Sequence, residues 1–264
     1  MITVNRLDFF SLFKDNSSSM KKRGLVSCII PAYNESKTVG GVVKFCLGVD
    51  EIGEIIAVND GSSDETSSEL KKFEGKIKII NLSKNSGKGY AVSAGIRKAS
   101  LPYLLFLDGD LFNLEKHFIF SIINPVLEGK ADMTIGMFNT LSQPFDPWWK
   151  LGGQRCLRKK DIRPDLKKLE KTKYGLEVFL NSKYAKKRLV VVPILTDKKT
   201  HIVKTSKQGD WLAGYVREIW QVFSQTISVK SAPYREKMKT KFIKDLSSYL
   251  RVSIDRIKKY LSEE

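Results

Sequence analysis

Asp108-Gly109-Asp110 is the segment of this sequence whose residue types and spacing suggest chemistry most directly. It follows the apolar run 101–107, so two carboxylates would stand one residue apart at the end of a strand. Such carboxylates grip hard divalent cations, and Gly109 lets the backbone approach a ligand closely. Mg²⁺ or Mn²⁺ held in this way can bridge two phosphates of a nucleotide and stabilise a leaving diphosphate.

A second polar cluster, 59–64, follows the apolar run 54–58. Asp60 would end a strand there and could accept hydrogen bonds from a base or a ribose. Asp64 suits the cap of the helix that follows. The two carboxylates can have these different roles side by side.

Two further clusters are weaker signals when taken alone. In 31–35, Tyr33 offers a flat surface and Glu35 an acceptor for hydroxyl groups, but the segment by itself predicts only a turn. In 85–89, glycines at the start of a helix favour the approach of a phosphate. Neither GxxxxGK[ST] nor GxGxxG is present, which argues against nucleoside triphosphate hydrolysis and dinucleotide binding.

Alternating apolar runs and helical patterns must position these clusters. Strands are predicted at 25–30, 54–58, 77–82 and 101–107. The first connecting helix would be capped by Ser36 and would have an apolar face of Val39, Val42, Val43 and Leu47. Repeated β-α units predict an α/β fold with a doubly wound, mostly parallel sheet and helices on both faces. Ligands bind such sheets at the carboxyl ends of the strands, where each polar cluster falls.

The charge of the chain is uneven. Of its 264 residues 42% are hydrophobic and 28% charged, which excludes disordered and low-complexity classes. Residues 1–140 hold 17 basic and 16 acidic residues, whereas 141–264 hold 29 and 13, so most of the net +17 lies in the second half. This asymmetry predicts an anionic partner for that half, unless its lysines are simply solvated.

The cellular setting is predicted from absent signals. No apolar run reaches the ~18 residues of a membrane span, and the N-terminus lacks a signal-peptide core. Cys28, Cys46 and Cys156 show neither CxxC nor zinc spacing. We therefore expect a reduced, cytoplasmic protein, with peripheral contact at the cytoplasmic face of the membrane left open.

Four strings occur in the order CIIPAYNE, VNDGSSDET, NSGKGYAVSAGI and FLDGD. Together they resemble the nucleotide-sugar half of family 2 glycosyltransferases with the GT-A fold, over about residues 25–140. The resemblance implies a nucleoside-diphosphate sugar donor, built on UDP or GDP, and Mg²⁺ or Mn²⁺ as cofactor. The residues that it places around the donor are Pro31, Ala32, Tyr33, Glu35, Asp60 (at the base), Lys88, Asp108 and Gly109. Asp108 and Asp110 form the metal motif, and Asp110 is also an expected catalytic residue.

In related glycosyltransferases a Gly-rich segment shapes the sugar and acceptor pocket, and 152–155 would correspond to it here. Gln154 would contact the donor, and Arg155 could pair with a phosphate through two hydrogen bonds. The aromatic patch at 145–149 could stack on a sugar, lie at a lipid interface or belong to a core.

The resemblance also places an acidic residue near the acceptor, and Glu177, in a predicted helix over 174–184, is the expected catalytic or acceptor-binding carboxylate. His201 follows a predicted strand at 189–195; some GT-A enzymes use such a histidine as an extra metal ligand, although it could equally be structural. Lys204 lies on the following loop and could hold the diphosphate.

The sequence predicts a phosphate-bearing acceptor. No general-base motif stands out, and an ionised phosphate needs no strong base. The expected acceptors are, in order, a polyprenyl phosphate, a soluble phosphorylated acid such as phosphoglycerate, and a glycan hydroxyl. The QxxRW signature is absent, which argues against cellulose-like or chitin-like polymer synthesis.

The expected domains are a polar extension (1–22), a GT-A domain (23–205, with donor half 25–140 and acceptor half 141–205) and a basic amphipathic tail (206–264). The tail would lie on an anionic membrane or pack as a helical hairpin. Two rival classes remain. A nucleotidylyltransferase would carry a Gly-rich loop where this chain has PAYNE, and a nucleic-acid-binding protein would need a reading module that is not evident.

Overall fold

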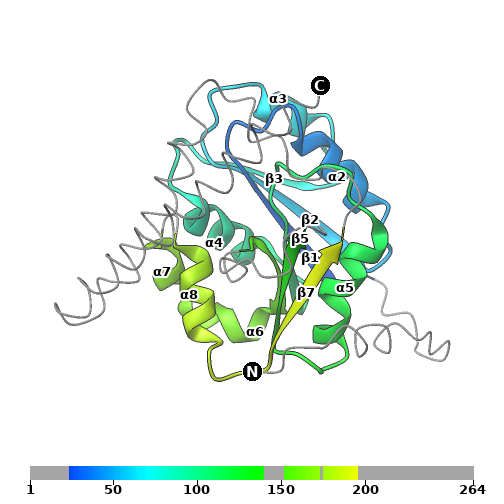
Figure 1. The fold of residues 1–264 in the computed structure, drawn as a ribbon. Coiled ribbons are helices and arrows are strands. Elements are labelled where there is room, and N and C mark those ends of the chain that lie inside the picture. The colour runs from blue at the N-terminus through cyan, green and yellow to red at the C-terminus, as the bar shows by residue number, and fades with distance from the viewer. Residues whose placement is uncertain (1–23, 140–151, 173–174, 196–264) are drawn as a thin grey trace, which may run out of the picture. The chain divides into compact units, whose positions relative to one another are not determined.

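The computed structural model describes residues 24–139, 152–172 and 175–195. The predicted N-terminal extension and basic tail lie outside these residues. The described part contains a seven-stranded sheet in the order β3-β2-β1-β4-β6-β5-β7 (Figure 1). The strands are β1 (Val26–Ala32), β2 (Ile52–Asn59), β3 (Lys78–Asn81), β4 (Tyr103–Phe106), β5 (Met133–Asn139), β6 (Gln154–Arg158) and β7 (Leu189–Leu195). All paired strands are parallel except β6, which runs antiparallel to β4 and β5.

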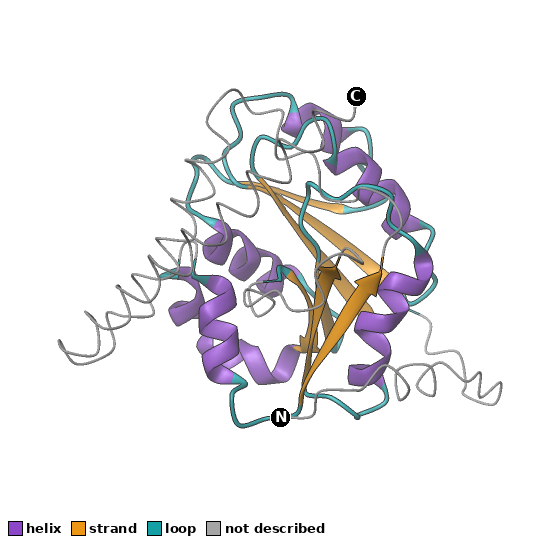
Figure 2. Cartoon of the chain, in the orientation of Figure 1, coloured by secondary structure: helices purple, strands orange, loops and turns teal. Residues whose placement is uncertain are grey.

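Helices cover both faces of this sheet (Figure 2). They are α2 (Val39–Leu47), α3 (Thr66–Lys71), α4 (Lys88–Lys98), α5 (Lys116–Leu127), α6 (Lys159–Ile162), the 3₁₀ helix η2 (Arg163–Asp165), α7 (Leu166–Glu170) and α8 (Leu176–Lys183). The predicted α/β fold with a mostly parallel sheet is therefore confirmed.

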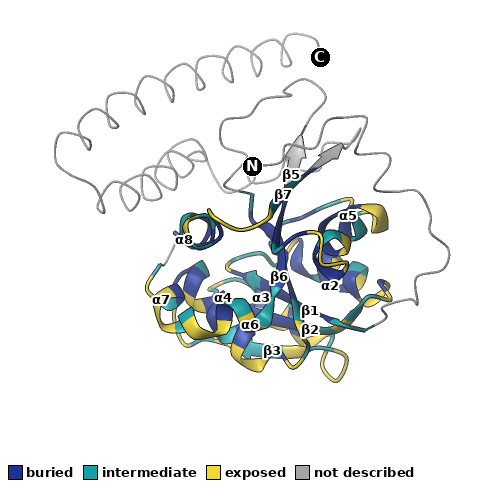
Figure 3. Ribbon diagram, turned by 90° about the horizontal axis from the view of Figure 1, so that it is seen from below, coloured by how far each residue is buried: buried dark blue, intermediate teal, exposed yellow. Residues whose placement is uncertain are grey.

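Two apolar cores result from the alternation of side chains along the strands. In β1, Cys28 and Ile30 pack with α2 and α5, whereas Ile29 faces the opposite core with α4, α7 and α8. Strands β1, β4 and β6 are accordingly buried almost throughout, and many exposed residues lie on the outer sides of the helices (Figure 3). A short central strand that is apolar on both faces is what a parallel sheet covered by helices requires.

The first helix differs from its prediction in two details. It begins at Val39 with Thr38, not Ser36, at the N-cap, and the backbone amide of Ser36 donates a hydrogen bond to Asp64. Its buried face consists of Val39, Val42, Val43 and Cys46. Leu47 was expected on this face but is 43% exposed, since the helical repeat carries position 46, not 47, toward the sheet.

The sequence patterns predicted neither strand β5 nor strand β6, and β6 carries residues of the predicted site. Residues 152–155 were expected only as a pocket segment, yet Gln154 and Arg155 begin a buried strand between β4 and β5. This antiparallel strand, which falls in the expected acceptor half, is therefore inserted between two strands of the expected donor half. Among the described residues, no helix combines the length and apolar character that crossing a bilayer requires.

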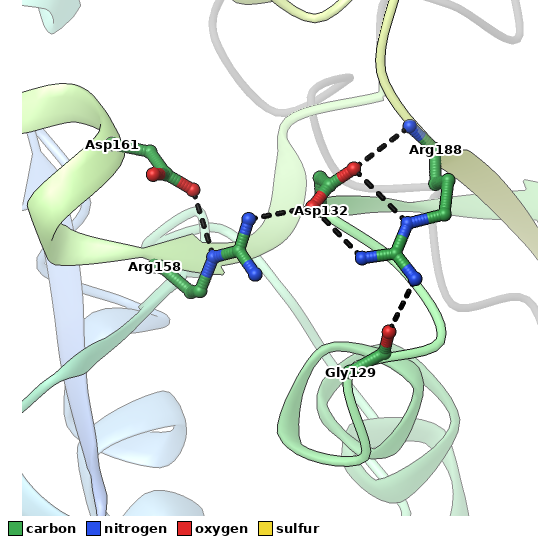
Figure 4. A network of polar contacts seen from close by, with 5 residues as sticks. All are labelled: Gly129, Asp132, Arg158, Asp161 and Arg188. Carbon is green, nitrogen blue, oxygen red and sulfur yellow. Dashed lines mark hydrogen bonds and ion pairs between the residues drawn. The ribbon is translucent and has the colours of Figure 1, made fainter.

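A polar network ties β5, β6 and β7 together at the end of the sheet away from the predicted site (Figure 4). Asp132, just before β5, accepts hydrogen bonds from the backbone amide and side chain of Arg188, just before β7. Asp132 also accepts a 2.5 Å bond from Arg158, the last residue of β6, which pairs in addition with Asp161. The bonds from Arg188, followed by those from Arg158, lower the pKa of Asp132 from 3.8 to about 2.

This network predicts a defined acid sensitivity. A carboxyl group whose pKa is lower in the folded than in the unfolded protein stabilises the fold at pH values above its unfolded-state pKa. This contribution is lost as pH falls through the pKa of the folded state. For Asp132 the loss falls between about pH 4 and pH 2 and amounts to about 2 kcal/mol. We expect Asp132→Asn to reduce the free energy of unfolding at pH 7 by this amount and to flatten its dependence on pH in that interval. Denaturant unfolding at several pH values measures both effects. Glu65→Gln, at an exposed position, is the control. If the free energy of unfolding depends on pH equally in the two variants, Asp132 does not have a lowered pKa.

Candidate active site

The predicted polar clusters meet at the carboxyl edge of the sheet. Ala32 at the end of β1 is the register partner of Asn59 at the end of β2, and its carbonyl accepts a bond from the amide of Asp60. The Asp108–Asp110 segment follows β4, the other neighbour of β1. Thr38, at the start of α2, donates a 2.7 Å hydrogen bond to the carbonyl of Gly109. Segments up to 71 residues apart are thereby fixed at one place.

A buried ion-pair cluster forms the centre of this edge. Nζ of Lys88, the first residue of α4, lies 2.6 Å from Oδ1 of Asp108 and 2.8 Å from Oε1 of Glu177 in the first turn of α8. The side chains of Lys88 and Asp108 are each 25% exposed and that of Glu177 is 10% exposed. Burial disfavours the ammonium ion, but the two carboxylates outweigh burial and raise the pKa of Lys88. Lys88 therefore joins the segment after β4 to helix α8 as a permanent cation.

The Gly-rich segment covers this cluster at very close range. A Cβ atom on Gly153 would overlap Oδ2 of Asp108 and would lie 2.7 Å from Nζ of Lys88, so any side chain at this position would force these two groups to shift. Gln154, the next residue, donates a 3.0 Å hydrogen bond from Nε2 to Oδ2 of Asp108. Both carboxylate oxygens of Asp108 are thus engaged, one by a cation and one by an amide.

Arg155 lies deeper than the sequence suggested. Its side chain is fully buried, with Nε bonded to the carbonyl of Gly152 and Nη1 2.8 Å from Oδ1 of Asn181 in α8. Burial lowers the pKa of Arg155 to about 10, against the opposing charges of Glu177 and Asp108, so the group remains a cation at neutral pH. In this position Arg155 holds the glycine turn against α8, and its contact with a phosphate stays a prediction.

Asp60 also has a structural task at this edge. It is only 3% exposed, and its two carboxylate oxygens accept bonds from the amides of Ser86 and Gly87 at 2.7 and 2.8 Å. Burial raises its pKa, although the two hydrogen bonds act in the opposite direction. These bonds fix the loop that carries Lys88 into α4. Recognition of a base by Asp60 stays a prediction.

The segment after β1 is held by the loop after β2. The amide of Asn34 donates to Ser62, and its side-chain oxygen accepts a bond from the amide of Ser63. Asn34 has a φ of 55°, a left-handed conformation that asparagine tolerates. The loop leaves Tyr33 42% exposed beside this edge. A base can stack only on an aromatic ring that is accessible in this way. Pro31 and Ala32 pack against Gly109, whose Cβ would lie 3.2 Å from the carbonyl oxygen of Pro31.

The residues expected to hold a divalent cation can be tested for fit. Asp108 and Asp110 supply the carboxylate oxygens that Mg²⁺ and Mn²⁺ prefer. Among the described residues no three ligand side chains gather at one point. One or two carboxylates completed by substrate phosphates are, however, an ordinary arrangement for Mg²⁺, so the donor set fits. The third expected ligand, His201, lies outside the described residues, as do Lys204 and the aromatic patch at 145–149.

Two contacts of the site carry no signal in the local sequence. Thr38 and Gly109 are 71 residues apart and Lys88 and Glu177 are 89 apart, so only the fold brings each pair together. Asn181, which fixes Arg155, was likewise not predicted. A pattern search along the chain finds motifs at strand ends, but it cannot find the partners that orient them.

Residues 27–185 match the model of glycosyl transferase family 2, and the chain belongs to this family. With a mostly parallel sheet whose carboxyl edge carries the family motifs, it has the GT-A fold. The predicted resemblance is therefore confirmed.

Poly-β-1,6-N-acetyl-D-glucosamine synthase from Staphylococcus epidermidis is 38% identical over 88 residues, 32% of this chain and 21% of that protein. The synthase from Staphylococcus aureus strain COL is 33% identical over 104 residues, 38% of this chain and 25% of that protein. The matches thus span about a fifth to a quarter of the length of these relatives.

Solved structures share the fold. Glucosyl-3-phosphoglycerate synthase from Mycobacterium tuberculosis, in complex with Mn²⁺, UDP-glucose and glycerol 3-phosphate, has a TM-score of 0.59 at 18% identity, over 78% of this chain and 79% of that chain. Staphylococcus aureus TarS 1–349 has a TM-score of 0.52 at 20% identity, over 66% of this chain and 59% of that chain.

Proposed function

We propose that this chain transfers a sugar from a nucleoside-diphosphate sugar to a phosphate-bearing acceptor, with a polyprenyl phosphate as the first candidate. The observation that carries the proposal is the Lys88–Asp108–Glu177 cluster, which joins the donor motif after β4 to helix α8 of the acceptor half. Membership of family 2 argues against the nucleotidylyltransferase and nucleic-acid-binding alternatives.

The chain's own residues have distinct tasks in this proposal. Tyr33 offers a stacking surface, and the loop fixed by Asp60 places Lys88. Asp110, with Asp108, would hold a divalent cation, which supplies charge neutralisation for the departing diphosphate. Lys88 is a cation already oriented at the same edge, so it supports the developing negative charge without reorganisation.

A phosphate acceptor agrees with the contacts of Glu177. Its Oε1 is engaged by Nζ of Lys88 at 2.8 Å, so this carboxylate already has a partner within the protein. A phosphate is already an anionic nucleophile near neutral pH and needs no proton removed. The M. tuberculosis synthase was solved with phosphoglyceric acid and with glycerol 3-phosphate, so this fold is compatible with phosphorylated acceptors.

The direct test is a transfer assay with radiolabelled sugar. UDP- and GDP-sugars would be combined with Mn²⁺ and with three acceptors in parallel: a short polyprenyl phosphate, 3-phosphoglycerate and a glycan that offers only hydroxyl groups. The proposal expects product with a phosphate acceptor. Robust transfer to the glycan alone would refute it, and product with phosphoglycerate alone would favour the soluble alternative.

Glu177→Gln tests the role of the carboxylate itself. If the acceptor is an ionised phosphate, we expect kcat to fall less than about tenfold, with no change in the pH profile, because no proton is transferred. If Glu177 is a general base for a hydroxyl, the loss is on the order of 10²–10⁴. Glu177→Ala is the comparison variant, because it also removes the hydrogen-bond partner of Lys88.

A further inference from the structure

A cavity of about 870 Å³ opens at the opposite end of the sheet from the candidate active site. Its lining comes from the turn before β4 and from the α6–η2 region: Ser100, Leu101, Pro102, Tyr103, Arg158, Lys159, Lys160, Arg163 and Pro164. Tyr103 is the first residue of β4 and pairs with Arg158, the last of antiparallel β6, whereas Asp108 follows the other end of β4. The cavity is therefore separate from the candidate active site.

The lining is strongly cationic. Four of its side chains are basic and none is acidic. Arg158 is neutralised by Asp132 and Asp161 (Figure 4). Nζ of Lys159 donates to the carbonyl of Ala99, a neutral acceptor that does not cancel its charge.

Lys160 and Arg163 are exposed and make no ion pair within the described part of the chain. Together with Lys159 they place around one cavity three positive charges that form no ion pair with any described residue. An anion bound there would relieve their mutual repulsion, and the Arg163 guanidinium offers a planar fork of donors that suits a phosphate.

The cavity is also fixed in shape before any ligand arrives. The backbone amide of Lys159 donates a 2.8 Å bond to the carbonyl of Pro102, which joins the two lining segments directly. Arg158 is held from behind by two carboxylates. Leu101, Pro102 and Pro164 add apolar wall, so the site suits an anion that carries an organic body. Because the two lining segments are already joined, less backbone entropy is lost on binding.

We propose that this cavity binds a phosphate-bearing anion at a site distinct from the active site. The phosphate can belong to a soluble phosphorylated compound or to the headgroup of an anionic lipid, which present the same chemistry to Lys160 and Arg163. The proposal does not depend on the proposed function, because no residue of the cavity belongs to the donor edge.

The test uses the full chain and the double variant Lys160→Gln/Arg163→Gln. The matched control, Lys71→Gln/Lys76→Gln, removes two exposed lysines from α3 and the turn after it, an equal change in charge. One arm titrates inorganic phosphate and follows the amide NMR signals of Ser100, Tyr103, Lys160 and Arg163. The other arm measures co-sedimentation with vesicles of phosphatidylcholine alone or with phosphatidylglycerol.

In at least one of the two arms, we expect the affinity for phosphate or for anionic vesicles to fall at least tenfold in the Lys160/Arg163 variant. The same affinity should fall less than twofold in the control. A loss in the phosphate arm alone identifies a soluble ligand, and a loss in the vesicle arm identifies a headgroup. If these amide signals do not respond to phosphate, and both variants bind vesicles equally, the proposal is overturned. Sugar transfer, measured in parallel, should remain at the parental level in both variants.

Discussion

Replacing Gly153 with alanine is expected to lower sugar transfer at least 100-fold. The added Cβ would overlap Oδ2 of Asp108 and press on Nζ of Lys88, so the ion-pair cluster must shift. A displacement of about 1 Å at a catalytic site can cost on the order of 10² in rate. Overpacking of this kind also costs about 1–3 kcal/mol of stability. Steady-state kinetics and denaturant unfolding of the same preparation measure the two effects separately.

Gly41→Ala is the matched control for this variant. Gly41 lies in α2, and a Cβ there would meet nothing within 4 Å. Because alanine is favoured over glycine inside a helix, this variant should be more stable by about 0.5–1 kcal/mol and keep its activity. Equal activity of Gly153→Ala and Gly41→Ala would show that the close packing of the Gly-rich segment on Asp108 is irrelevant to transfer.

Replacing Asp110 with asparagine is expected to abolish metal-dependent transfer while sparing the fold. The substitution keeps the size of the side chain but removes the charge that is expected to hold the cation. The loss should reach at least about 100-fold, since a bound metal contributes several kcal/mol to the transition state. Asp110 is only partly buried, so we expect the stability to change by no more than about 0.5 kcal/mol.

Two comparisons make the Asp110 result specific. Asp50→Asn makes the same change in an exposed turn before β2, at the other end of the sheet, and should leave transfer unchanged. Titration with Mn²⁺ should show that excess metal restores part of the activity of Asp110→Asn. Full activity of that variant at low metal concentration would show that Asp110 is not needed to hold the cation.

Much of this fold could be predicted because its signals are local. Apolar runs that end in polar turns placed β1 through β4 within a few residues, and the repeated β-α units predicted the parallel sheet. The same logic placed Asp60 and Asp108 at the carboxyl edge. The prediction for Leu47 was wrong because this residue lies at the edge of the apolar face that Val39, Val42 and Val43 define, whereas Cys46 lies near its centre.

The partners within the site could not be predicted, because they depend on three-dimensional packing. Nothing near Lys88 in the sequence indicates that its ammonium bridges Asp108 and Glu177. Strand β6 is too short and too polar to be recognised, since its first two residues are Gln154 and a fully buried Arg155. A cationic side chain in a strand can be buried only where polar partners such as Asn181 satisfy its hydrogen bonds. The sequence pattern does not show these partners.

Every proposed role at this edge of the sheet depends on binding of a nucleoside-diphosphate sugar through a divalent cation. Isothermal titration calorimetry with UDP and GDP, each with and without Mn²⁺, measures this binding. We expect one diphosphate to bind at least tenfold more tightly with Mn²⁺, and Asp110→Asn to lose that enhancement. If neither nucleotide binds, or if affinity is unchanged by both Mn²⁺ and the Asp110 substitution, this edge is not a metal-dependent donor site.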